Sequence, residues 1–417
     1  MDSTGGNMSA SSRRVVVTGM GVISPCGKTV EENWENIVAG RTGIDIIKAF
    51  DVSDYSSQVG GEVKDFDPNE YIERKDAKRM DRSSQLAVAA SAETVSHLDV
   101  DKADGDNFGV IIGSGIGGIK TFEKQHERYM KGGPSRISPF FIPMMISDMA
   151  SGLVSIRYGF KGPNYATVSA CASGGHAIAT SWMAIKSGYC DAVVTGGTEA
   201  TISPMALGGF CQMKALSTRN DDPKTSSRPF DLDRDGFVMA EGAGIILLEE
   251  LEHAKARGAE IFAELAGVGM TADAYHITAP SPDGEGALSS MCMALKDAGI
   301  TPEDIGYINA HGTSTQYNDR AEAQAILSLF GRDSSVDVSS TKSCTGHLLG
   351  GAAGVEFIIS TMALVNNVMP PTANLENIDE DCRLNHLLKA REKKLNYVLS
   401  NSFGFGGHNV SLVLKKF

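Results

Sequence analysis

The sequence predicts an α/β protein built from two similar halves. Short runs rich in β-branched residues end at glycines and precede segments of helical composition along the whole chain. The pattern recurs in three pairs of segments: 15–21 with 263–270, 109–115 with 305–312, and 168–176 with 338–347. Glycine accounts for 46 of the 417 residues, which suits many tight corners between strand and helix. A repeated strand–helix unit favours two α/β halves packed together.

The bulk composition excludes several classes of protein. The chain is 42% hydrophobic and 21% charged, as expected of a globular protein. Its formal net charge of −13 argues against nucleic-acid binding, because neutralising phosphates needs a basic face. No apolar run reaches the roughly 18 residues of a membrane span, and no signal-peptide pattern opens the chain. The cysteines are widely spaced without a C-x-x-C pair, which indicates a reducing compartment and neither a disulfide framework nor a zinc site.

The first half is expected to span residues 13–259, after a disordered leader at 1–12. Its predicted strands are 15–21, 107–112, 191–196 and 236–249, and its predicted helices are 31–39, 85–98, 177–185 and 251–258. Residues 208–219 predict a glycine-rich loop that holds Phe210. The apolar, proline-containing stretch 131–147 predicts a lid or a subunit contact. The second half, 260–417, repeats the strand–helix pattern and contains a predicted helix at 352–365.

Five basic residues lie close together in this acidic chain. On a helix their spacing would place them on one face; they are Arg74, Lys75, Lys78, Arg79 and Arg82. Such a stripe is either a solvated face or a dock for an acidic partner.

Cys171 lies where a strand-like run meets a helical segment, so its thiol should sit near the first helical turn. Unpaired amide N–H groups and the helix dipole at that position favour the thiolate over the thiol. The surrounding small residues would let a substrate carbonyl approach the backbone, where the N–H of Cys171 could face its oxygen. The alternative is a small buried hydrophobe, and residues elsewhere must decide between the two.

The second half supplies two histidines at corners that match the corner of the cysteine. His311 follows a predicted strand in His-Gly-Thr-Ser-Thr, and His347 follows Thr-Gly at the start of a predicted helix. A lone histidine is commonly a satisfied core or surface residue, but the glycine-flanked corners single these two out. Because ligands favour switch points between such units, we expect Cys171, His311 and His347 to converge on one site.

Three further features surround this expected site. Lys342 is either a surface lysine or a positive charge that biases the imidazoles toward the neutral form. Glu356, in the following predicted helix, would accept a hydrogen bond from Lys342 or from a ring. The stretch 401–409, with Phe403 and Phe405 around a glycine, is either a gate or oxyanion loop, or a hairpin corner.

A cysteine with histidines and an acid also describes a papain-like hydrolase, which spacing alone does not exclude. Two histidines favour a different task. Neutral imidazoles can both donate hydrogen bonds to one thioester oxygen and so stabilise an enolate, whereas hydrolysis needs one imidazole as base.

Four motifs together carry a resemblance that covers Arg13 to Phe417. They are SACASG around Cys171, HGTST from His311, STKSCTGH ending at His347, and the C-terminal SFGFGG. In these motifs the chain resembles the β-ketoacyl-[acyl-carrier-protein] synthases of the thiolase fold, most closely the type II elongating enzymes. The resemblance implies two pseudo-repeated α/β halves in a layered α-β-α-β-α structure, with the nucleophile in the first half and the histidines in the second.

The resemblance also implies a reaction. Cys171 would take an acyl chain from its carrier as a thioester, and His311 and His347 would assist decarboxylation of malonyl carrier. The resulting enolate would attack the acyl-enzyme and give a 3-oxoacyl carrier two carbons longer, CO2 and free carrier. Lys342 and Glu356 match the supporting residues of the family. No metal is expected, and no cofactor beyond the phosphopantetheine of the acyl carrier protein.

The remaining matches complete the expected site. The N–H groups of Cys171 and Phe405 match the oxyanion hole, and Phe405, with Phe403 beside it, matches the gate. Other matches fall in three groups: Ile116 and Phe210 in the acyl pocket; Thr278, Thr313 and Thr315 at the pantetheine; and Lys75, Lys78, Arg79 and Lys214 at the dock for the acidic carrier. The family is homodimeric, with 131–147 near the partner. The resemblance implies fatty-acid elongation in a bacterial cytoplasm or an organelle matrix.

Two comparisons narrow the class. Thiolases place a second cysteine in the C-terminal glycine loop, where residues 404–409 have none, and initiating synthases carry asparagine where this chain has His347. A non-catalytic subunit of a condensing heterodimer would lack the nucleophile, so Cys171 argues against it. A cysteine hydrolase would release free acid from an acyl thioester without malonyl carrier.

Overall fold

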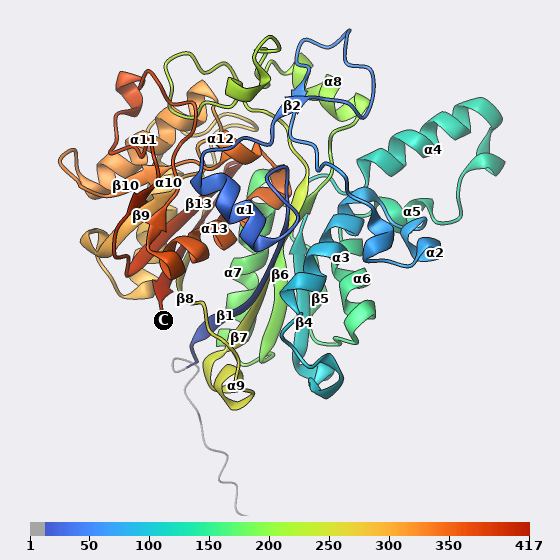
Figure 1. Cartoon of the computed structure of the whole chain (residues 1–417), viewed down its shortest axis with the longest axis horizontal. Coiled ribbons are helices and arrows are strands. Elements are labelled where there is room, and N and C mark those ends of the chain that lie inside the picture. The colour runs from blue at the N-terminus through green and yellow to red at the C-terminus, as the bar shows by residue number, and fades with distance from the viewer. Residues whose placement is uncertain (1–12) are drawn as a thin grey trace, which may run out of the picture.

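The computed structural model of the chain describes residues 13–417, so the predicted leader at 1–12 lies outside the described residues. One sheet runs through the protein (Figure 1). Its strands are β1 (Val15–Ile23), β4 (Phe108–Gly113), β5 (Asn164–Tyr165), β6 (Ala192–Glu199), β7 (Gly242–Glu250), β8 (Ala263–Ala272), β9 (Ile305–Asn309), β10 (Asp337–Ser339), β13 (Tyr397–Gly404) and β14 (His408–Lys416). Two short ribbons pair β2 (Asp45–Ile46) with β3 (Val59–Gly60) and β11 (Val368–Met369) with β12 (Arg391–Glu392).

The sheet consists of two equivalent halves. The strand order is β5-β4-β6-β7-β1 in the first half and β8-β14-β13-β9-β10 in the second. In each half the two pairs nearest the junction are antiparallel and the two outer pairs are parallel. Within the ten-stranded sheet, the two halves are joined by the pairing of β1 with β8, at Val16 with Glu264 and Val17 with Ala263. The predicted repeat of strand–helix units is therefore confirmed.

Helices lie between and outside the two halves. The central α7 (Ser173–Lys186) and α13 (Ala352–Asn366) contact each other and strands of both halves, so the halves lie on opposite sides of this pair. The outer helices are α3 (Arg82–Thr94) and α6 (Met149–Tyr158) on the first half, and α10 (Glu285–Ala298) and α11 (Gln316–Phe330) on the second. The layered α-β-α-β-α arrangement implied by the resemblance is thus confirmed.

The segment Leu349–Asn366, which includes α13, has a mean hydropathy of 1.4 and is long and apolar enough to cross a membrane by length and composition. However, 83% of that window is buried inside the protein. Its apolar character is explained by the contacts of α13 with both half-sheets, as in the core helix of a layered fold.

The remaining helices are α1 (Val30–Val38), α2 (Arg74–Ala77), α4 (Ile119–Gly132), α5 (Phe141–Met145), α8 (Pro204–Gln212), α9 (Leu251–Ala256) and α12 (Lys342–Thr345). Helix α4 projects away from the layers, and the chain returns through α5 (Figure 1). Apolar side chains are exposed along this excursion: Phe122, Tyr129, Met130, Phe140, Ile142 and Ile146.

Two local predictions were wrong. The glycine-rich loop predicted at 208–219 begins inside α8, which starts with Pro204 at a position where a missing N–H costs nothing. The basic residues do not share one helix face, because α2 ends at Ala77 and Asp81 caps a new helix at Arg82.

The third pair of matched segments was wrong in register. Ala170 and Leu349 have positive φ angles of 50° and 48°, and each opens a 3-10 turn directly before a central helix. Leu349 in the second half is therefore equivalent to Ala170 in the first half, and Gly350 is equivalent to Cys171. The segment that the sequence pairs with the cysteine turn instead contains α12, and the first half has no helix equivalent to α12 between β5 and Ala170.

Candidate active site

Cys171 lies in the 3-10 turn Ala170–Ala172, directly before α7. The side chain of Ser173 stabilises the left-handed backbone of Ala170: its Oγ donates to the carbonyl of Ala170 at 2.6 Å and accepts from the N–H of Ser169 at 2.9 Å. Cys171 is thereby held at the end of the central helix, as predicted, and is 8% exposed.

The charge state of Cys171 differs from the prediction. Burial raises the pKa of its thiol to about 12, although the charge of Lys342 and the N–H groups of Phe405 and Cys171 itself lower it. The expectation of a thiolate stabilised by the helix terminus was therefore wrong. Desolvation outweighs the dipole and the local donors, so Cys171 rests as a thiol and loses its proton as it attacks.

The end of β13 connects the two sides of the site. A Cβ on Gly404 would lie 2.7 Å from the carbonyl oxygen of Ser169 and 3.2 Å from the nitrogen of Cys171, so the strand touches the nucleophile turn. The neighbouring Phe403 packs edge-on against His311, with ring centroids 5.8 Å apart. Consecutive residues of one strand thus contact the cysteine side and the histidine side.

His311 follows β9 in a loop fixed by a buried carboxylate. Glu322 in α11 accepts the N–H groups of His311 and Gly312 at 2.9 and 2.8 Å. Nδ1 of His311 lies 3.2 Å from the Lys342 ammonium, which has protons to donate and no lone pair to accept one. The proton of the neutral ring is therefore on Nε2.

Lys342 is a cation held inside the protein. Its side chain is 1% exposed and donates to the carbonyl of His311 at 2.6 Å and to Oε1 of Glu356 at 2.5 Å. Glu356, on α13, is also buried. The predicted contact between Lys342 and Glu356 is present, and the carboxylate compensates the buried charge.

His347 is fixed by its backbone and leaves its ring unpaired. Its N–H donates to Val238 at 2.7 Å, and its carbonyl accepts from Ala240 at 2.9 Å. The ring packs edge-on against His311 and Phe237, with centroids 5.3 Å apart in both cases. Within residues 13–417, neither ring nitrogen has a hydrogen-bond partner, although the residue is only 2% exposed. Such an orphaned polar group points to a missing ligand.

Both imidazoles are neutral. Burial, followed by the charge of Lys342, lowers the pKa of His311 and that of His347 well below the ordinary value of 6.5. The predicted influence of Lys342 has the right direction, but burial is the larger cause. Two neutral rings side by side can donate two N–H groups to one oxygen without bringing charge into the site.

The residues matched to the acyl pocket differ in their surroundings. Phe210 packs edge-on against Phe237 at 5.3 Å and belongs to the apolar cluster that contains Cys171. Ile116 is 39% exposed in the described chain. Its N–H donates to Glu199 at 3.3 Å, and a Cβ on the adjacent Gly115 would lie 3.3 Å from the carbonyl of Ala170. Ile116 therefore lies on a loop that touches the nucleophile turn.

The three threonines matched to the pantetheine lie on two loops. Thr313 and Thr315 bond to each other through their hydroxyls at 2.9 Å, between His311 and α11. Thr278 belongs to another loop, where the carbonyl of Ile277 accepts from the N–H of Gly406 at 2.8 Å. Thr278 thus lies beside the C-terminal glycine loop.

Three of the four basic residues matched to the carrier dock form one surface cluster, and Lys214 lies apart from it. Lys75, Lys78 and Arg79 line an open surface pocket with Arg74 and Phe140. The guanidinium of Arg79 lies 4.5 Å above the ring centroid of Phe140. Lys214 is exposed at the end of α8, outside this pocket, and the fifth residue of the predicted stripe, Arg82, pairs inward with Glu241 at 2.7 Å.

Sequence reasoning missed two carboxylates that shape the site. Glu199 ends β6 and accepts the N–H groups of Gly115 and Gly350 at 2.7 and 3.1 Å, which joins the two halves beside Cys171. Glu322 holds the His311 loop. An acidic residue closing the apolar strand AVVTGGTE was a usable signal for Glu199, whereas nothing local marked Glu322.

Comparison with known proteins agrees with this geometry. Residues 12–254 match the family "Beta-ketoacyl synthase, N-terminal domain" and residues 262–376 match "Beta-ketoacyl synthase, C-terminal domain". The chain is 52% identical over 409 residues to a 3-oxoacyl-[acyl-carrier-protein] synthase 2 of Synechocystis, covering 97% of this chain and 98% of the relative. It is 50% identical over 409 residues to the synthase of the same name from Staphylococcus aureus, covering 97% and 99%.

Among solved structures, the fold is similar to that of a type II PKS acyl-carrier protein's ketosynthase, solved in complex with that carrier and bound to a hexaketide. The TM-score is 0.91 at 33% identity, and the match covers 97% of this chain and 100% of the other.

Proposed function

This chain belongs to the β-ketoacyl synthase family, and from that membership we propose how its residues divide the reaction between them. The reaction is the decarboxylating Claisen condensation of fatty-acid elongation. An acyl chain and malonyl-acyl carrier protein give 3-oxoacyl-acyl carrier protein, CO2 and free carrier. The enzyme is thus an acyltransferase.

Cys171 is the nucleophile of the first half-reaction. Its sulfur attacks the thioester carbonyl of the acyl carrier, the carrier thiolate leaves, and the proton lost by Cys171 ends on the carrier thiol. The N–H groups of Cys171 and Phe405, which lower the pKa of the Cys171 thiol, stabilise the oxyanion of the tetrahedral intermediate. The apolar cluster with Phe210 receives the acyl chain.

His311 and His347 act in the second half-reaction. The malonyl thioester binds with its carbonyl oxygen between the two neutral rings. As CO2 leaves, the electron pair of the broken C–C bond passes to that oxygen, and two N–H groups stabilise the enolate. The unpaired nitrogens of the buried His347 are the observation that carries this assignment.

Condensation returns the chemistry to Cys171. The enolate carbon attacks the acyl-cysteine carbonyl, whose oxygen again meets the N–H groups of Cys171 and Phe405. The thiolate of Cys171 then leaves and takes up a proton from solvent, which restores the thiol, and the new carbon–carbon bond remains. We expect no metal or cofactor of the enzyme's own, because a thiol, two imidazoles and backbone donors supply every step; the phosphopantetheine belongs to the carrier.

An acyl carrier protein is the proposed partner of the basic surface around Lys75, Lys78 and Arg79. These residues and Phe140 offer an exposed cationic and aromatic face to an acidic carrier. A similar ketosynthase was solved in complex with its carrier. Lys75→Glu should raise the KM for malonyl carrier about tenfold and leave malonyl-pantetheine unaffected, whereas Lys394→Glu at another exposed site should change neither. Equal effects on both substrates would remove the dock from this surface.

We further propose a homodimer and a reducing compartment. The edge strand β5 is exposed at both residues, and the excursion from α4 to α5 exposes many apolar side chains, which suits a second copy of the chain. Sedimentation equilibrium of the wild type against Ile142→Lys should show loss of dimer in the variant. All seven cysteines are free, which suits a bacterial cytoplasm or an organelle matrix.

One assay tests the function as a whole. The protein is incubated with acyl carriers of several lengths, with and without malonyl carrier, and the products are weighed. Condensation gives a 3-oxoacyl carrier only when malonyl carrier is present. Free acid released without malonyl carrier would indicate a hydrolase, and carrier binding without any product would indicate a non-catalytic subunit.

A further inference from the structure

Residues 227–240, called here the strap, are bonded to both histidine loops. Near its start, Oγ of Ser227 donates to the carbonyl of Lys342 at 2.8 Å. In its middle, the N–H of Gly236 donates to the carbonyl of Ser314 at 3.1 Å. Its last residues are bonded to the backbone of His347, as described above. The position of the strap therefore affects His311 and His347 together.

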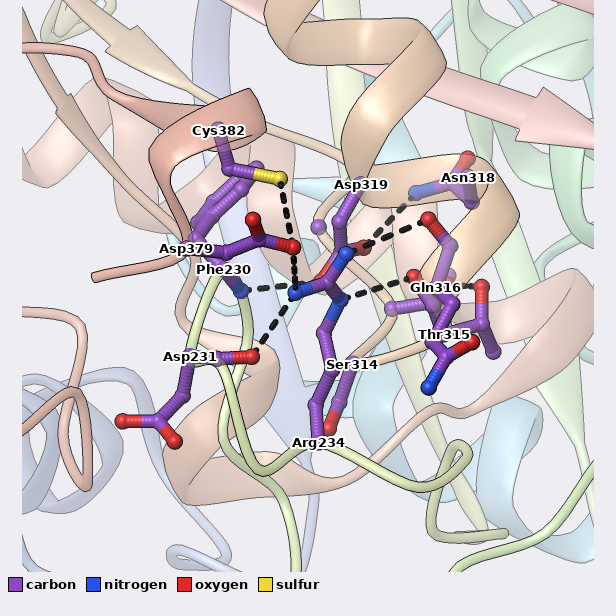
Figure 2. A network of polar contacts seen from close by, with 12 residues as sticks. Phe230, Asp231, Arg234, Ser314, Thr315, Gln316, Asn318, Asp319, Asp379 and Cys382 are labelled. Carbon is purple, nitrogen blue, oxygen red and sulfur yellow. Dashed lines mark hydrogen bonds and ion pairs between the residues drawn. The ribbon is translucent and has the colours of Figure 1, made fainter. Parts of the chain in front are cut away.

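Arg234 links the middle of the strap to α11 by hydrogen bonds (Figure 2). Its side chain is 1% exposed, and its Nε and Nη2 each donate at 3.2 Å, to the carbonyls of Thr315 and Gln316. Its Nη1 donates to the carbonyl of Asp231 at 2.7 Å and to Oδ2 of Asp379 at 2.8 Å. Every nitrogen of the guanidinium is used.

The acceptors around Arg234 are themselves fixed. Asp319 lies 3.5 Å from Nε and also accepts the N–H of Phe230 at 2.9 Å, so α11 and the strap share a second link (Figure 2). The carbonyls of Thr315 and Gln316 belong to the first turn of α11, the helix that carries Glu322. A planar fork of five donors matches this set of acceptors, and a lysine ammonium does not.

The cysteine side has no such link. The turn of Cys171 is held by Ser173 and by contact with Gly404, and no hydrogen bond of the described residues joins it to the strap. Phe237 and Met239 of the strap pack in the apolar cluster that contains Cys171, so the strap contacts the cysteine side by packing alone. A displacement of the strap would therefore move the two histidines relative to each other, while the turn of Cys171 keeps its own hydrogen bonds.

We propose that Arg234 is a positioning residue for the decarboxylation half-reaction. Through the strap and α11 it sets the separation of His311 from His347. This inference rests on the proposed function, since it assumes that the two rings share one substrate oxygen. A shift of about 1 Å in such an arrangement can cost a hundredfold in rate.

The test measures the two half-reactions separately, per active site titrated with acyl label. For Arg234→Ala we expect acylation of Cys171 within about threefold of wild type and malonyl decarboxylation reduced about a hundredfold. Millimolar guanidinium, far below denaturing concentrations, should restore part of the decarboxylation, and Arg234→Lys should remain impaired. The matched control is Arg257→Ala, which removes an arginine from the buried Glu249 elsewhere and should not alter the ratio of the two rates.

Three further results distinguish a folding defect, failure of this inference and failure of the proposed function. If Arg234→Ala does not fold, Asp379→Asn weakens the same link from a partly exposed position and should change the ratio in the same direction. Equal loss of both half-reactions in the variants, or the same split in Arg257→Ala, would overturn the inference. A wild-type protein that neither acylates nor decarboxylates would instead refute the proposed function.

Discussion

Nζ of Lys342 lies 3.2 Å from Nδ1 of His311, in a site where both side chains are nearly free of solvent. This contact fixes which nitrogen of the ring carries the proton. Burial is the larger cause of the lowered pKa values of His311 and His347, and the charge of Lys342 lowers both further. Glu356 pairs with this buried cation.

Cys171→Ala should abolish acyl-enzyme formation, because no other thiol occupies the turn before α7. We expect label transferred from a radioactive acyl carrier to fall about a thousandfold or more, as for the loss of other enzymic nucleophiles. Cys292→Ala, at the exposed cysteine, should retain full labelling. Label that persists on the Cys171 variant at the wild-type level would exclude the assigned role.

His311→Ala and His347→Ala should show the opposite pattern. Acylation should survive, and release of CO2 from malonyl carrier should fall a hundredfold to a thousandfold, the usual effect of removing one oxyanion donor. Released 14CO2 and acyl label are measured on the same sample. His97→Ala, at an exposed histidine after α3, serves as control for loss of an imidazole. Unchanged CO2 release in either active-site variant would remove that ring from the mechanism.

Lys342→Met should make the outcome of decarboxylation depend on pH. Burial keeps the pKa values of His311 and His347 below 6.5, but without the ammonium they rise from their wild-type values. The fraction of protonated rings at the low-pH end of the range from 8 to 6 is therefore larger in the variant than in wild type. An imidazolium can protonate the enolate, which gives acetyl carrier in place of condensed product. The ratio of these products, read by mass spectrometry, should rise at low pH. Lys393→Met, at a lysine paired with buried Asp337, should behave as wild type; a flat ratio in Lys342→Met would contradict the prediction.

Gly404→Ala should impair acylation although residue 404 has no side chain to lose. The added Cβ would lie 2.7 Å from the Ser169 carbonyl, closer than real contacts allow, so the nucleophile turn or the oxyanion loop must move. We expect a rate of acylation about a hundredfold lower, measured by stopped flow. At Gly209 a Cβ would meet nothing within 4 Å, and Gly209→Ala should have the wild-type rate.

His386→Gln should reduce the loss of stability in acid. Burial lowers the pKa of His386 from 6.5 to about 4, so the unfolded chain binds the extra proton between these values. Its contribution to the free energy of unfolding is therefore lost as the pH falls from about 6.5 toward 4, by about 3 kcal/mol at 1.36 kcal/mol per pKa unit. Glutamine retains a donor for the carbonyl of Cys382. Denaturant unfolding at pH 7 and pH 4.5 should show a smaller difference for the variant than for wild type; equal differences would exclude His386 as a contributor.

The opposite sign holds for three buried carboxyl groups in the same range. Burial raises the pKa values of Glu199, Glu322 and Glu356 to about 7, so each of them costs stability as the pH rises toward 7. The His386 variant must therefore be compared with wild type at each pH, because the total pH dependence mixes contributions of both signs.

The sequence was sufficient for the parts of the site that motifs mark. Cys171, His311 and Lys342 lie at or beside corners that glycines and strand patterns reveal, Glu356 lies in the helix that follows, and the structure brings Lys342 into contact with His311 and Glu356. The repeat also predicted two similar α/β halves, but the order of the strands within each half came from the structure.

The sequence did not predict which polar and ionisable side chains become buried by tertiary packing. The pKa of Cys171 is raised because side chains from distant segments exclude water, and no local pattern reports their arrival. The polar stretch around Asp231 and Arg234 reads as a surface loop, but both residues are buried because their partners come from α11 and the segment near Asp379. Such a strap differs from an ordinary surface loop because its buried polar groups are hydrogen-bonded to residues that are distant in the sequence.

Gly350, which is equivalent to Cys171 in the second half, leaves the enzyme with a nucleophile in the first half alone. A Cβ at Gly350 would lie 2.3 Å from the nitrogen of Gly115 and 2.7 Å from Oε2 of Glu199. No side chain, and so no second thiol, fits at that point of the pseudo-twofold arrangement. Each chain can therefore hold one growing acyl group at a time. The position at which the pseudo-twofold arrangement would place a second nucleophile is filled by backbone that supports the first nucleophile, Cys171.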